Sequence, residues 1–157
     1  LGRLLARITV ALGGKPTVWE TQAARRDGAL GYDVIDSADD TRRDYRAVYD
    51  VSGDANILDT LVARLAPTGE IVLAGFYSDR LSFAFPAAFM REARIRVAAE
   101  WRAGDVEAVQ GLLRAGSLSL GGLVTHREPA TGAAAAYARA FQDPTCLKMV
   151  LDWRART

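Results

Sequence analysis

The chain has 157 residues, of which 50% are hydrophobic and 25% are charged. This length and composition suffice for one sizeable core, so we expect one domain, or one domain with an appendage. Twenty basic and nineteen acidic side chains leave a net charge of +1, and the arginines are scattered along the chain. This pattern argues against a nucleic-acid partner and favours a small molecule or another protein.

Several other classes of protein are excluded by what the sequence contains. One cysteine and one histidine are too few for an internal disulfide or an ordinary structural zinc site, so we predict no metal. No apolar run approaches the ~20 residues that cross a bilayer, and the first residues have no signal-peptide pattern. We therefore expect a cytoplasmic protein without a transmembrane segment.

The first predicted helix covers residues 1–12, where leucine and isoleucine recur at helical spacing. Arg3 and Arg7 are expected on its solvent face. No strand and no capping side chain precedes this helix, although a helix that packs on a sheet needs both. We therefore expect that the sheet lacks its first strand.

Strands and helices alternate along the next part of the chain. Apolar runs predict strands at 16–20, 32–36, 44–53 and 69–77, and amphipathic patterns predict helices at 21–31 and 56–67. Strands that alternate with helices form crossover units, which predicts a parallel, doubly wound α/β sheet.

The remaining elements are predicted less regularly. We expect strands at 80–86, 93–101, 120–125 and 146–153, a short helix through 89–90, and helices at 105–115 and 130–141. Apolar and basic residues alternate in 93–101, which indicates a strand at a sheet edge. Such an edge either pairs with a second copy in a homodimer or carries charge that prevents pairing.

Gly2 and Glu20 together indicate a dinucleotide site. In a doubly wound sheet, a glycine-rich turn leads into a helix whose amino end holds a pyrophosphate, and an acid about 20 residues later binds the ribose. Gly2 stands where the last glycine of that turn would fall, and Glu20 ends the next strand. A carboxylate at this place would repel a 2′-phosphate, which favours NAD over NADP.

Other positions near strand ends leave two interpretations open. Arg25 and Arg26 would suit NADP, since an arginine can hold its phosphate, but we expect Arg26 on a solvated helix face. Asp50 either contacts the cofactor or stabilises a turn. Phe76 and Tyr77 either contact a ligand or pack in the core.

The sequence resembles the medium-chain alcohol dehydrogenases over nearly its whole length. The resemblance is carried by "PTVWET", "GYDVID", "YDVSGD", "LDTLVARLAPTGEIVLAGFY" and "LLRAGSLSLGGLVTHR". The runs "YDVSGD", "LAGFYS", "LSFAFPAAFMREARIRVAAEW" and "CLKMVLDW" are similar to the branch of this family that acts on bacteriochlorophyllides. The resemblance implies NAD-dependent oxidation of a secondary alcohol to a ketone. The substrate it implies is the 3-(1-hydroxyethyl) group of a bacteriochlorophyllide, which becomes 3-acetyl during synthesis of this photosynthetic pigment.

The resemblance also implies which residues bind the cofactor. These residues would form the pyrophosphate turn, supply the acid that binds the adenosine ribose and its basic neighbour, surround the nicotinamide ribose, and supply a cation for the pyrophosphate. In chain order these residues are Gly2, Glu20, Arg25, Ser52, Gly53, Ala74, Gly75, Phe76 and Lys148.

The family's domain plan implies a boundary near residue 100. Residues 1–100 would form a Rossmann-like nucleotide-binding domain that is incomplete at its amino end. Residues 101–157 would form an α+β appendage that belongs to the catalytic domain. Because the family's catalytic groups lie in the preceding domain, the catalytic residues stay unknown, and we expect an inactive fragment of a longer enzyme.

Two alternatives to this function stay open. The chain could belong to another medium-chain dehydrogenase, with a simple alcohol or a polyol as its substrate. It could also be a non-catalytic module that binds NAD, because a fold does not by itself establish a reaction.

Overall fold

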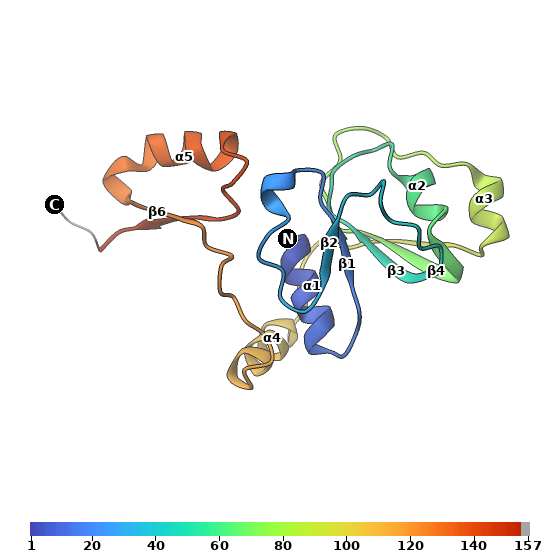
Figure 1. The fold of residues 1–157 in the computed structure, drawn as a ribbon, viewed down its shortest axis with the longest axis horizontal. Coiled ribbons are helices and arrows are strands. Elements are labelled where there is room, and N and C mark those ends of the chain that lie inside the picture. Colours follow the sequence, from blue (N-terminus) through green and yellow to red (C-terminus); the bar gives the residue numbers. More distant parts are fainter. Residues whose placement is uncertain (155–157) are drawn as a thin grey trace. The chain divides into compact units, whose positions relative to one another are not determined.

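A computed structural model describes residues 1–154, which form two compact units (Figure 1). The first unit comprises residues 1–2 and 40–106, and the second contains the other described residues. Every strand pair among the described residues is parallel. Parallel strands joined through helices give the chain the Rossmann-like α/β fold that the alternating pattern predicts.

The first unit contains a three-stranded sheet in the order β3-β4-β5. Its elements are β3 (Tyr45–Asp50), α2 (Leu58–Val62), β4 (Leu65–Leu73), α3 (Phe85–Met90) and β5 (Arg94–Val97). Val48 of β3 is level with Ile71 of β4, which is level with Ile95 of β5. Each crossover carries one of the two helices, so the carboxyl ends of all three strands meet at one edge.

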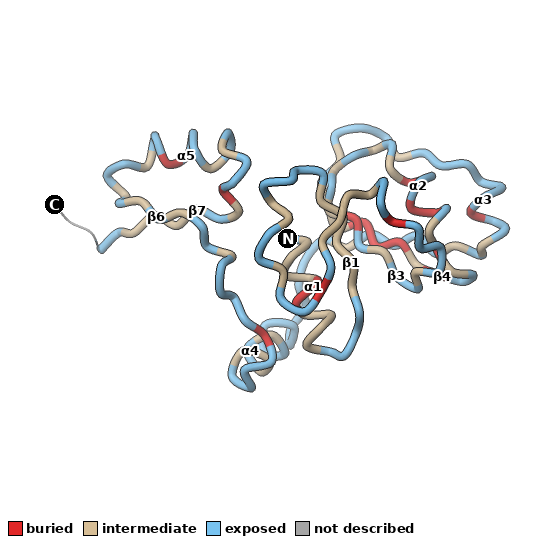
Figure 2. Tube along the Cα trace, in the orientation of Figure 1, coloured by how far each residue is buried: buried red, intermediate tan, exposed pale blue. Residues whose placement is uncertain are grey.

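The core of the first unit lies between β4 and α2, as the buried segments in Figure 2 show. Val62, Leu65 and Ile71 are each completely buried. β4 is the middle strand of its sheet, which explains why its sequence is apolar without polar alternation. Near its start, Thr68 and Gly69 interrupt the pairing with β3.

The second unit consists of two smaller parallel pairs with their helices. Its elements are most of α1 (Gly2–Ala11), β1 (Thr17–Trp19), the 3₁₀ turn η1 (Ala23–Arg25), β2 (Asp33–Ile35), most of α4 (Asp105–Arg114), β6 (His126–Pro129), the 3₁₀ turn η2 (Ala130–Gly132), α5 (Ala133–Gln142) and β7 (Met149–Asp152). β1 pairs with β2, and β6 pairs with β7. The helix α5 connects the parallel strands β6 and β7, so this segment is also a β-α-β crossover unit.

Arg7 is buried, so the prediction that it faces solvent is wrong. Its Nη1 atom donates hydrogen bonds to the carbonyl oxygens of Ser119 and Gly121, at 2.9 and 2.8 Å. These bonds attach the loop after α4 to α1. Burial of a guanidinium is tolerated where carbonyl oxygens replace the water it loses.

Three predicted elements differ from the structure. The helix expected at 21–31 is only the turn η1, which ends at Arg25, and the positive φ angles of Gly28 and Gly31 are incompatible with a helix that continues to residue 31. The strand expected at 80–86 is absent, since the Ala84 N–H bonds to Asp59 Oδ1 instead of to a neighbouring strand. The strand expected at 120–125 is a turn, and pairing begins at His126.

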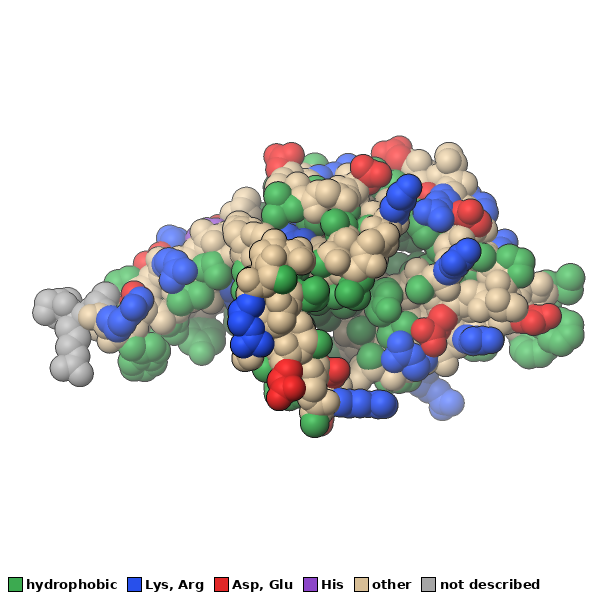
Figure 3. Space-filling view, turned by 90° about the horizontal axis from the view of Figure 1, so that it is seen from below, with side chains coloured by type: hydrophobic (Ala, Val, Ile, Leu, Met, Phe, Trp, Pro, Cys, Tyr) green, Lys and Arg blue, Asp and Glu red, His purple; other side chains and the backbone are tan. Residues whose placement is uncertain are grey.

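β5 lies at the edge of its sheet, as its alternating pattern predicts, because among the described residues it pairs only with β4. The adjoining helix α3 exposes Phe85, Phe89 and Met90. Apolar side chains gather in the part of Figure 3 where α3 lies. No helix within residues 1–154 is long and apolar enough to span a bilayer.

Candidate functional site

The loops that follow β3 and β4 lie directly against each other. Gly53 has a φ of +76°, and a Cβ added there would stand 2.8 Å from the Phe76 carbonyl oxygen. A Cβ added to Gly75 would stand 3.1 Å from the Gly53 nitrogen. Only glycine permits this approach, so the structure brings the predicted residues of both loops together at the carboxyl ends of the two strands.

The start of α1 adjoins the loop after β3. A Cβ on Gly2 would meet Val51 Cγ2 at 3.6 Å, an ordinary van der Waals distance. Gly2 therefore lies beside the residues that precede Ser52 and Gly53. The free N–H groups of a first helical turn attract anions, and the part of Gly2 in binding pyrophosphate stays a prediction.

Asp50 ends β3 and is buried, with 5% of its surface exposed. Its Oδ1 accepts the Ser52 N–H at 2.9 Å, and its Oδ2 accepts the Tyr77 hydroxyl at 2.6 Å. Its carbonyl oxygen also accepts the Ala74 N–H at 2.9 Å. The structure thus supports the second interpretation of Asp50, in which its side chain stabilises a turn.

The Tyr77 phenol has a perturbed acidity. Burial raises the pKa of Tyr77 well above its ordinary value, and the hydrogen bond and negative charge of Asp50 raise it further. The phenol therefore keeps its proton at physiological pH and donates it to the Asp50 carboxylate. No lysine, arginine or histidine forms an ion pair with Asp50 within the described residues.

Glu20 follows β1 directly, in the second unit. Its Oε1 accepts the Gln22 N–H at 2.9 Å, whereas Oε2 has no hydrogen bond among the described residues. Arg26 fixes the backbone here, because its Nε donates to the Glu20 carbonyl oxygen at 2.8 Å and its Nη2 pairs with Asp36 at 2.6 Å. The prediction that Arg26 lies on a solvated helix face is therefore wrong.

Asp36 is held in its ionised form. The Ala38 N–H and then the Arg26 guanidinium lower the pKa of the Asp36 carboxyl. A carboxylate with a lowered pKa keeps the ion pair with Arg26 intact at neutral pH. The ends of β1 and β2 are thereby tied together beside Glu20.

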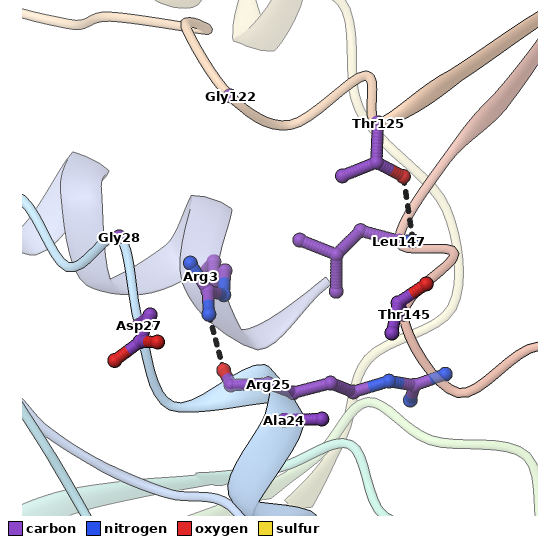
Figure 4. A pocket seen from close by; sticks show the side chains of 9 residues that line it. All are labelled: Arg3, Ala24, Arg25, Asp27, Gly28, Gly122, Thr125, Thr145 and Leu147. Carbon is purple, nitrogen blue, oxygen red and sulfur yellow. Dashed lines mark hydrogen bonds between the residues drawn. The ribbon is translucent and has the colours of Figure 1, made fainter.

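Arg25 lies in the wall of an open hollow of about 240 Å³ (Figure 4). Its Nε donates to the Pro144 carbonyl oxygen, and its own carbonyl oxygen accepts a hydrogen bond from Arg3. Thr125 and Leu147 face it across the hollow. The side chain is thus oriented by backbone groups and keeps the rest of its guanidinium available for an anion.

Lys148 immediately precedes β7 and is exposed. Its carbonyl oxygen accepts the N–H groups of Thr125 and His126, at 3.1 and 3.3 Å. Its side chain has no ion pair with another described residue. No contact joins Lys148 to Glu20 or Arg25, so its part in cofactor binding stays a prediction.

The sequence pattern did not identify Arg3 as a hydrogen-bond partner of Arg25 or Asp36 as the ion-pair partner of Arg26. Their partners are 22 and 10 residues away along the chain, beyond the range of helical or strand spacing. The sequence offered one signal for such pairs: basic and acidic side chains are almost equal in number, so many arginines can pair with carboxylates. No group of three or more metal-ligating side chains occurs in the described part of the chain.

Comparison with known proteins finds close relatives that are named dehydrogenases. It is 61% identical over 156 residues to the 2-desacetyl-2-hydroxyethyl bacteriochlorophyllide A dehydrogenase of Cereibacter sphaeroides, covering 99% of the chain and 49% of that protein. The protein of the same name from Rhodobacter capsulatus is 59% identical over 98% of the chain and 49% of its own length. The chain thus spans about half the length of the curated relatives it matches. No family model matches it.

Solved structures show the same fold. An alcohol dehydrogenase from Escherichia coli CFT073, complexed with NADH, superposes with a TM-score of 0.82 at 18% identity. The match covers 95% of this chain and 48% of that one. At this identity the likeness establishes the fold.

The raised pKa of Tyr77 predicts a loss of stability at alkaline pH that the Tyr77→Phe variant lacks. The unfolded phenol titrates near 10.0, whereas the folded one titrates higher. The stabilisation is therefore fully present below pH 10 and is lost as the pH rises toward the folded-state value. Urea unfolding from about pH 8 to about pH 11 should show a steeper decline for the wild type. Parallel declines in the two proteins would contradict the prediction.

Proposed function

We propose, on the premise that this chain is a homologue of the bacteriochlorophyllide dehydrogenases, that it is the dinucleotide-binding half of such an enzyme. The complete enzyme would use NAD to oxidise the 3-(1-hydroxyethyl) group of a bacteriochlorophyllide to 3-acetyl. About 60% identity over nearly the whole chain supports this substrate class. The share of about half of each relative supports a contribution by the chain to cofactor binding, with the catalytic groups elsewhere.

The observation that carries the proposal is the contact between the two glycine-containing loops. Ligands of open α/β sheets bind beyond the carboxyl ends of the strands. Here Gly53 and Gly75 let the backbones of the two loops approach each other, which brings their main-chain groups together at that edge. The residues present therefore fit a dinucleotide, and the NADH complex of an alcohol dehydrogenase with this fold supports the same cofactor.

Each predicted residue has a definite task in this proposal. The backbone at Ser52, Gly53 and 74–76 orients the nicotinamide ribose, and the first turn of α1 at Gly2 holds pyrophosphate oxygens. When bound, the nicotinamide ring supplies the hydride acceptor. The chain's own residues bind and orient it.

The adenosine end of the cofactor would be held by charged side chains. Glu20 has one carboxylate oxygen free to accept a ribose hydroxyl, which supports NAD over NADP. Arg25 and Lys148 supply positive charge for phosphate oxygens. We further propose that residues 101–157 belong to the catalytic domain of the complete enzyme, whereas residues 1–100 bind the nucleotide.

Substitution of Glu20 tests the ribose contact. In the full-length protein, Glu20→Gln should weaken NADH binding about tenfold, because a charged hydrogen bond is worth about 1.5–3 kcal/mol, and should narrow the preference over NADPH. Fluorescence titration with both cofactors measures this. The exposed Glu107, on α4, provides the control Glu107→Gln, which should leave NADH affinity unchanged. Unaltered NADH affinity in Glu20→Gln would show that the carboxylate does not bind the ribose.

Turnover by the full-length protein tests the substrate. Incubation with NAD and a 3-(1-hydroxyethyl) bacteriochlorophyllide should give the 3-acetyl pigment and one equivalent of NADH, followed by absorbance. Simple alcohols and polyols serve as competing substrates. Oxidation of these alone would favour another medium-chain dehydrogenase, and NADH binding without any turnover would favour a non-catalytic module.

We also propose that β5 pairs with its copy in a homodimer. The outer edge of β5 is unpaired among the described residues, and Ile95 and Val97 are exposed there. Sedimentation of the full-length protein should show a mass that rises with concentration toward twice the monomer. Val97→Lys should shift this equilibrium toward monomer, whereas Val106→Lys on α4 should not. A monomer at every concentration would refute the dimer.

A further inference from the structure

We infer that Asp50 and Tyr77 are positioning residues that hold the two cofactor loops at their working separation. The inference deepens the proposed function and rests on it. The sequence leaves open whether Asp50 or Tyr77 contacts the dinucleotide, and neither belongs to the set of residues proposed to bind it. Both lie at the contact between the loop after β3 and the loop after β4, where, within the described residues, no other side chain forms a hydrogen bond from one loop to the other.

Asp50 connects three groups of the two loops, two through its carboxylate and one through its backbone carbonyl oxygen. Oδ1 holds the Ser52 N–H on its own loop, and Oδ2 holds the Tyr77 hydroxyl from the other loop. The Asp50 carbonyl oxygen receives the Ala74 N–H. A displacement of either loop would therefore break a bond to this one residue.

The Tyr77 bond matters more than an ordinary surface hydrogen bond because Asp50 is 95% buried and lacks a cationic partner among the described residues. A buried carboxylate must be satisfied by hydrogen bonds, and loss of one donor leaves it poorly compensated. The loop after β4 would then have to move, or water would have to enter. Either response changes the backbone that receives the nicotinamide ribose.

The glycine contacts make such movement consequential. A Cβ on Gly53 would stand 2.8 Å from the Phe76 carbonyl oxygen, and a Cβ on Gly75 would stand 3.1 Å from the Gly53 nitrogen. Tyr77 Oη lies 3.3 Å from the position of a Cβ on Gly75. Because the loops are packed at this distance, a small change at Tyr77 shifts the backbone of Gly75 and Phe76 relative to Gly53.

The same sheet contains a matched control at its opposite end. Tyr45 begins β3, and its hydroxyl donates to Oδ2 of the buried Asp40 at 2.8 Å. Tyr45→Phe and Tyr77→Phe each delete a tyrosine hydrogen bond to a buried carboxylate, but Asp40 also forms an ion pair with Arg64 at 3.6 Å, whereas Asp50 has no ion pair among the described residues. Only the second deletion lies at the carboxyl ends of the strands.

The decisive experiment measures NADH affinity of the full-length protein and its two tyrosine variants. Tyr77→Phe should raise the dissociation constant about tenfold, from the loss of one hydrogen bond to a charged group, and Tyr45→Phe should leave it within about twofold. Asp50→Asn should weaken binding similarly, and the double variant Asp50→Asn, Tyr77→Phe should be no weaker than either single variant, since both remove one interaction. Unchanged affinity in Tyr77→Phe, or an equal loss in Tyr45→Phe, would overturn the inference.

Amide hydrogen exchange without cofactor separates this inference from the proposed function. Tyr77→Phe should speed exchange at Ser52, Gly53 and Gly75 but leave the start of β3 unchanged, and Tyr45→Phe should do the reverse. If the wild type binds no NADH, the proposed function fails, and unchanged exchange at these three amides would still overturn the role of the pair in holding the loops.

Discussion

The contact between the backbones after β3 and β4 is the constraint on which the rest of the first unit depends. Two parallel strands bring their carboxyl ends together, but a ligand site requires that the loops beyond them also stay close and unobstructed. Gly53 and Gly75 permit this close approach. The buried carboxylate of Asp50 stabilises it through hydrogen bonds to both loops. The apolar packing of β4 against α2 supplies the rigid base for both.

The second unit is held together in a different way. Its buried apolar side chains are few and mostly small or scattered, as Ala6, Leu118 and Ala136 illustrate. Arginines supplement them by donating to carbonyl oxygens of distant loops: Arg7 binds the loop at 119–121, and Arg25 binds Pro144. A guanidinium has five donors in a fixed plane, so a single side chain can fasten a loop that has little apolar surface to bury.

Local sequence patterns predicted the elements whose stability is local or whose burial is complete. The apolar run 69–77 predicted most of β4, and the alternating run 93–101 predicted the edge strand β5. The prediction failed at 80–86. Apolar and polar residues alternate there, but the Ala84 N–H donates to the Asp59 carboxylate instead of to a neighbouring strand. It failed for Arg7 because charge alone suggested solvent, while its partners lie more than 110 residues away.

The same limit applies to the candidate site. Glycines and a strand-terminal acid predict a dinucleotide site from the sequence alone, since their chemistry depends on the local backbone. The pairing of Asp50 with Tyr77 depends on the register of two strands 27 residues apart, which no local pattern contains. The sequence therefore predicts the residues that would contact the cofactor. The residues that hold those loops in place become visible only in the structure.

A crystal structure of the full-length protein with NADH would test the central claim most directly. The account predicts that the nicotinamide-side ribose contacts the backbone of Gly53 and of residues 74–76, with the Tyr77 hydroxyl still bound to Asp50. A dinucleotide bound away from both loops would contradict it.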